Sequence, residues 1–174
     1  MPLDREPEIH AGPQPPPRAP AIIDKALVEP FPFRYSKVVA LGEIVSVQTF
    51  FSEDKTDIYR ESTFRISEIL KPGGRALKVG DSLGILSKGG SLRLPNGRIV
   101  TSEYRGDGSP LARGHYLLFL HERSDVPRFG VVTAWELRSE QVLPTSVACT
   151  PEEQEELTSL GSQLFLARAR STVH

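Results

Sequence analysis

The fold is decided by the stretch SKVVALGEIVSVQTFFSEDKTDIYRESTFRISEIL, which spans residues 36–70. It contains two runs of β-forming residues, Lys37–Phe51 and Thr56–Leu70, joined by the polar segment 52–55. Such runs flanking a polar turn are typical of paired strands. We therefore predict a long antiparallel hairpin that forms the centre of a small β-barrel.

The two runs differ in how their apolar residues alternate. In the second run Ile58, Phe64 and Ile66 share one parity and polar side chains share the other, which indicates a half-buried strand. In the first run most apolar residues, Val39, Leu41, Val45 and Val47, share one parity, and Ile44 has the other. Gly42 lies in the middle of that run, where glycine often marks a bulge or a sharp bend.

Further strands are expected along the rest of the chain. Leu83 and Ile85 alternate with Gly84 and Leu86 in a short strand. The contiguous apolar run within Arg113–Glu122 predicts a central strand buried on both faces. The next strands are expected at Phe129–Leu137 and Gln141–Leu143. We expect a barrel of five to six antiparallel strands.

A second hairpin is marked by the turn Pro95-Asn96-Gly97 between two short β runs. Asn-Gly is a strong hairpin signal because both residues accept positive φ. Leu92 and Leu94 precede the turn, and Ile99 and Val100 follow it. Much of this ribbon is polar, so we expect it to project from the barrel.

The C-terminal residues predict an amphipathic helix. Thr150 suits the N-cap, Pro151 the first helical position, and Glu153 completes a capping box. Leu157, Leu160 and Leu164 form an apolar stripe at helical spacing. We expect one helix that packs on the barrel and frays after Ala169.

The chain divides into four parts on this interpretation. Residues 1–20 hold seven prolines, which exclude regular helix or sheet, and are expected to be disordered. Residues 21–35 form a lead-in segment, 36–148 the barrel, and 149–174 the helix. The proline-rich head is interpreted as a linker or, alternatively, as a ligand for a proline-binding domain.

Composition places the chain among globular proteins without identifying a partner. Its 174 residues are 39% hydrophobic and 25% charged, with a net charge of −1, which argues against nucleic acid. One cysteine excludes an intrachain disulfide, and no apolar run is long enough for a transmembrane helix. The compartment stays open: exported, periplasmic or extracellular, if a signal peptide was removed, and otherwise cytoplasmic.

No residue pattern indicates catalysis, a metal or a cofactor. His115 and His121 share a strand parity, but six residues of strand span roughly 20 Å, too far for one metal ion. Zinc-ligand spacing and phosphate-binding or dinucleotide-binding glycine motifs are absent from the sequence. Cys149 precedes the helix, where a thiol pKa can fall, although a lone cysteine more often packs as a small apolar residue.

Four segments together resemble a known family. They are residues 38–47 (VVALGEIVSV), 64–71 (FRISEILK), 79–81 (VGD) and 114–120 (GHYLLFL). The pattern resembles the netrin module and the tissue inhibitors of metalloproteinases, in a cysteine-poor bacterial form, over about residues 36–145. The resemblance implies an OB-like barrel, often exported. The inhibitors' N-terminal metal-chelating cysteine has no counterpart here, so no functional residue is transferred.

These observations predict a non-enzymatic binding module for a protein or an extracellular polymer, existing as a monomer or weak oligomer. OB barrels bind ligands along strands 2–3 and the flanking loops. By that analogy alone, six side chains are candidate contacts or else solvated strand residues: Tyr59, Arg60, Arg65, Arg93, Arg98 and Tyr104. The alternatives are a domain that binds single-stranded nucleic acid and a hydrolase on a β-barrel scaffold.

Overall fold

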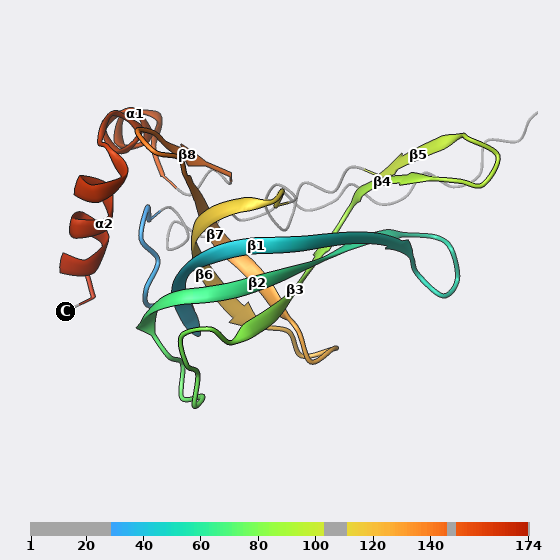
Figure 1. The fold of residues 1–174 in the computed structure, drawn as a ribbon, viewed down its shortest axis with the longest axis horizontal. Coiled ribbons are helices and arrows are strands. Elements are labelled where there is room, and N and C mark those ends of the chain that lie inside the picture. The colour runs from blue at the N-terminus through green and yellow to red at the C-terminus, as the bar shows by residue number, and fades with distance from the viewer. Residues whose placement is uncertain (1–28, 103–110, 146–148, 174) are drawn as a thin grey trace, which may run out of the picture.

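A computed structural model describes residues 29–102, 111–145 and 149–173 of the chain. The described residues form eight strands and two helices (Figure 1). The strands are β1 (Val38–Phe51), β2 (Ile58–Lys71), β3 (Ser82–Lys88), β4 (Gly90–Arg93), β5 (Ile99–Ser102), β6 (Gly114–Glu122), β7 (Phe129–Leu137) and β8 (Val142–Pro144). The helices are α1 (Pro151–Ser159) and α2 (Ser162–Ser171). The predicted proline-rich head, residues 1–20, and most of the lead-in segment lie outside the described residues.

Five strands, β1, β2, β3, β6 and β7, form a barrel that is partly closed. The main sheet has the order β3-β2-β1-β6-β7-β8, and all of these neighbours are antiparallel. A single parallel pairing, Ile85 with Phe129, joins β3 to β7 and completes the ring. A closed ring of five strands cannot be antiparallel at every neighbour, because the strand directions cannot alternate around an odd number. At least one parallel pair is therefore required, and the β3–β7 pair supplies it. The arrangement is an OB-like barrel and confirms the predicted fold class.

The β1–β2 hairpin bends around Gly42, as the glycine predicted. The register of the two strands shifts between Leu41 and Gly42 and again between Ile44 and Ser46. A Cβ on Gly42 would lie 2.7 Å from the Cζ atom of Phe64 and nearer still to the carbonyl oxygen of Arg65. The close approach of β2 therefore requires glycine at this bend.

Two apolar clusters lie on opposite sides of the sheet. The inner cluster fills the barrel and includes Ile44, Phe64, Ile66 and Leu118. The outer cluster joins β1, β6 and β7 to the helices and the lead-in segment, with Trp135 and Phe165 at its centre. Strand β6 supplies both clusters, since Tyr116 to Leu120 are all buried, and this confirms the predicted central strand.

The apolar stripe predicted for β1 does not face one side. Val39 and Leu41 belong to the outer cluster, whereas Val47 packs against the inner one together with Ile44. The register shift between Ile44 and Ser46 is the cause, because a bulge reverses which parity points inward. A strand buried on both faces at its start cannot be oriented from alternation alone.

The single predicted helix is two helices. The capping box at Thr150 and Glu153 starts α1 as expected, but the chain is extended at Leu160 and Gly161 before α2 begins. The change of direction carries Phe165 and Ala169 into the outer cluster and leaves Leu164 65% exposed. The predicted stripe therefore holds for Leu157 and, partly buried, Leu160, but not for Leu164.

The molecule has a helical end and a hairpin end. Helices α1 and α2 lie at one end in Figure 1, while the β1–β2 turn and the β4–β5 ribbon project at the other. The ribbon turns at residues 94–98, where Gly97 has φ 84°, as the Asn-Gly signal predicted. Within the described residues, the helices are too short to cross a membrane.

Candidate binding face

The outer face of β2 and β3 is the candidate site, and alternation determines which residues it presents. Inner positions of both strands are buried in the barrel, so the residues between them point outward. Segment 52–57, which joins β1 to β2, and segment 123–128, which joins β6 to β7, flank this face. The outward residues are Tyr59, Glu61, Thr63 and Arg65 of β2 and Gly84, Leu86 and Lys88 of β3.

A stacked pair of aromatic side chains, one exposed and one half-buried, lies at the hairpin end of the face. Phe50 is the cross-strand partner of Tyr59, and their rings stack with centroids 6.2 Å apart and planes 23° apart. Phe50 remains 40% exposed. Lys88 is the partner of Tyr59 on the other side, so one row across three strands carries two rings and a cation.

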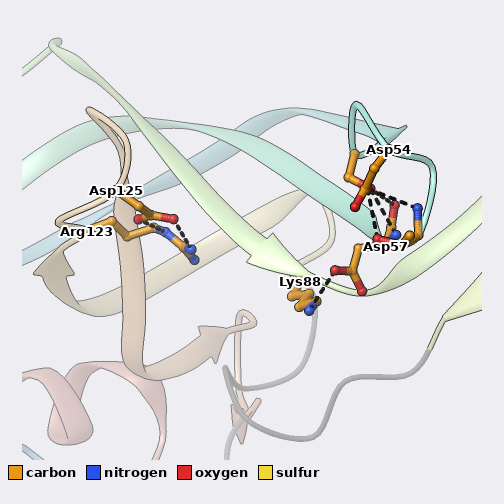
Figure 2. Close-up of polar contacts among 7 residues, drawn as sticks. Asp54, Asp57, Lys88, Arg123 and Asp125 are labelled. Atoms are coloured by element: carbon orange, nitrogen blue, oxygen red, sulfur yellow. Dashed lines mark hydrogen bonds and ion pairs between the residues drawn. The ribbon is translucent and has the colours of Figure 1, made fainter.

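Two cations at the face, Lys88 and Arg128, are paired with acids. The Lys88 Nζ atom lies 2.9 Å from a carboxylate oxygen of Asp57, a contact visible in Figure 2. Arg128 reaches back from its loop to form an ion pair with Glu61, and its side chain covers Gly84. Because acids neutralise these cations locally, the face does not present a concentrated positive charge.

Local hydrogen bonds fix the two flanking loops. The Asp54 carboxylate accepts hydrogen bonds from Ser52 and Thr56, which lower its pKa below the ordinary value. Arg123 donates to both oxygens of Asp125, at 3.0 and 2.8 Å, and lowers the pKa of Asp125 (Figure 2). Both carboxylates therefore stay ionised at neutral pH and hold their loops in shape.

The structure does not bring the predicted contact residues together. Tyr59 and Arg65 share the outer face but are six residues apart, roughly 20 Å along a strand. Arg60 has the opposite parity and lies beside Gly90, and its Nε is buried with no hydrogen-bond partner among the described residues. Arg93 and Arg98 are exposed on the projecting ribbon. Tyr104 lies outside the described residues.

Residues for metal binding or hydrolysis are not assembled in the described part of the chain. Groups of three or more metal-ligating side chains are absent there. His121 is exposed, its Nδ1 lies 3.2 Å from the carbonyl oxygen of Glu122, and its ring covers Gly130.

The aromatic pair includes one residue that sequence reasoning missed. Phe50 lies in the run Thr49-Phe50-Phe51, which lacks alternation, so its exposure was not evident. Only the register that places it opposite Tyr59 reveals the pair.

Comparison with protein-family models, with curated proteins and with solved structures gave no match to this chain.

Proposed function

We propose that this protein is a non-enzymatic binding module that engages a protein or an extracellular polymer through the β2–β3 face and its flanking loops. The observation that carries the proposal is the stacked Phe50–Tyr59 pair, in which Phe50 is 40% exposed and Tyr59 is half-buried. Aromatic side chains supply large contact area and are frequent anchors of binding surfaces.

This choice of face is supported by which outer surfaces of the barrel are buried under other elements and which are not. Residues 29–35 of the lead-in segment and both helices bury the outer side of β1, β6 and β7 and the end of β2 at Leu70. The residues of the β2–β3 face, 59–65 and 84–88, do not belong to this outer cluster, and OB barrels use this face and the adjoining loops for binding. The netrin-like relationship and an exported location are part of the same proposal and rest on the sequence resemblance.

Single-stranded nucleic acid is the competing ligand because the stacked rings lie beside Lys88. The pairing of Lys88 with Asp57 and of Arg128 with Glu61 argues against it. Each paired cation would have to leave a carboxylate before it could neutralise a phosphate, and the carboxylate would then repel the strand.

The test is co-sedimentation of the full chain with cellulose, chitin and gelatin, alongside retention on a column of single-stranded DNA. We expect binding to at least one polymer and an affinity loss of about tenfold or more in the double variant F50A/Y59A. The matched control is Tyr35→Ala, since Tyr35 is 39% exposed and lies away from the face. Retention on DNA that weakens with salt and is lost in F50A/Y59A would contradict the proposal and favour nucleic acid.

A further inference from the structure

A cleft at the helical end of the molecule is separate from the β2–β3 face. It lies between the lead-in segment and the C-terminal end of α2, which run beside each other in Figure 1. Its volume of about 500 Å³ is within the range of small-molecule sites. The lining residues are Glu29, Phe31, Phe33, Arg34, Lys71, Thr172 and Val173.

The ammonium group of Lys71 is held in place without an acidic partner. Its Nζ atom donates to the carbonyl oxygens of Phe33, at 2.6 Å, and Ser36, at 2.7 Å. An ammonium has three donors, so one remains after these two bonds. Among the described residues no carboxylate forms an ion pair with Lys71. A half-buried cation that is fixed and uncompensated is preorganised for an anionic group.

Part of the lining is apolar, and its two phenylalanines are firmly packed. Phe33 meets Phe119 edge-on, with centroids 5.2 Å apart, and Phe31 packs 5.3 Å from Phe165. Val173 adds an aliphatic side chain that is 39% exposed. Among the described residues of the lining, Arg34 is a second cation and Glu29 is the one acid. The lining therefore combines a net positive charge with an apolar wall.

We propose that this cleft binds a small organic carboxylate with an apolar body. The carboxylate pairs with Lys71, assisted by Arg34, and the apolar body packs against Phe31, Phe33 and Val173. An ion pair to a fixed ammonium favours the carboxylate over a neutral polar group of the same size. The site is independent of the polymer-binding function proposed above, because none of its lining residues belongs to the β2–β3 face.

The experiment titrates isotope-labelled full chain with sodium octanoate and, separately, with 1-octanol, while amide resonances are followed. We expect saturable shifts of the amides of residues 31, 33–36 and 71 with octanoate, and binding of octanol weaker by about tenfold or more. Lys71→Met should remove this preference for the carboxylate. Lys78→Met, at an exposed lysine beyond the cleft, should retain it.

If Lys71→Met does not give the NMR spectrum of a folded protein, a second variant tests the proposed carboxylate site. Val173→Glu places a negative charge on the cleft at a partly exposed position, and it should weaken octanoate binding about tenfold or more. Leu164→Glu, at an exposed position of α2, the helix that precedes Val173, is the matched control and should bind as the wild type does. The proposal is overturned if octanoate fails to saturate, if octanol binds equally well, or if the folded cleft variants keep wild-type affinity.

Discussion

At the scale of single residues, substitution of Phe64 tests whether its side chain fills the interior of the barrel. Its side chain is fully buried in the inner cluster and touches the bend at Gly42. Truncation in Phe64→Ala leaves a cavity, and we expect a loss of about 3–5 kcal/mol in the free energy of unfolding. Phe50→Ala removes a ring of the same size that is 40% exposed, and should cost about 1 kcal/mol or less. Urea denaturation measures both, and equal midpoints for Phe64→Ala and wild type would show the strand parity to be wrong.

The reactivity of the Cys149 thiol tests whether this residue is buried in the outer cluster. The residue is 3% exposed, and burial, followed by the negative charge of Glu153, raises the pKa of its thiol. Because the thiolate is the reactive form, iodoacetamide at pH 8 should alkylate the native protein at least about tenfold more slowly than a free thiol. Mass spectrometry follows the labelling, with the guanidinium-unfolded chain as control. Equal rates in the folded and unfolded chains would place the thiol at the surface.

At the scale of elements, the bend in β1 depends on a missing side chain. Gly42→Ala would press a methyl group against Phe64 and the carbonyl oxygen of Arg65, so either β2 or Phe64 must move. We expect destabilisation of about 1–3 kcal/mol by thermal or chemical unfolding. Gly161→Ser is the matched control because nothing lies within 4 Å of a Cβ there and serine suits an N-cap. Its effect should stay within about 0.5 kcal/mol, and a similar value for Gly42→Ala would refute the close approach.

Sequence pattern predicted those elements whose signals are local. The Asn96-Gly97 turn and the Thr150 capping box were located from a few neighbouring residues. The break at Gly161 was missed because the 3.6-residue period continues through Leu164, and only burial of Phe165 shows the change of direction. The bend at Gly42 was predicted, but the shift between Ile44 and Ser46, which reverses the parity of β1, depends on pairing with β2 and is a non-local property.

At the scale of the whole molecule, closure of the ring determines which loop lies against the β2–β3 face. The parity of Tyr59 and Arg65 was readable from the sequence, and both point outward. The ion pair between Arg128 and Glu61 joins residues far apart in the chain, and it forms because β7 meets β3 at Phe129. Arg60, one of the candidate contacts, has the parity opposite to that of Tyr59 and Arg65. Strand order, which alternation does not encode, decides which loops meet.

The attachment of α2 to the barrel gives a prediction for stability against pH. Arg170 binds both carboxylate oxygens of Glu68 in β2, at 2.9 and 2.6 Å, and these hydrogen bonds hold the pKa of Glu68 below its ordinary value of 4.5. A carboxyl group whose pKa is lower in the folded state stabilises the fold at pH values above its pKa in the unfolded state. This contribution to stability is lost as the pH falls through the pKa of the folded state.

Both partners are partly exposed, so we expect Glu68→Gln to cost about 0.2–1 kcal/mol at pH 7. The difference from wild type should persist down to about pH 5 and vanish in stronger acid, where Glu68 is protonated in both states. Denaturation of the two proteins from pH 7 to pH 2 measures this, with Glu140→Gln as an exposed control. A difference that is constant with pH would mean that packing of the side chain, and not its charge, connects α2 to β2.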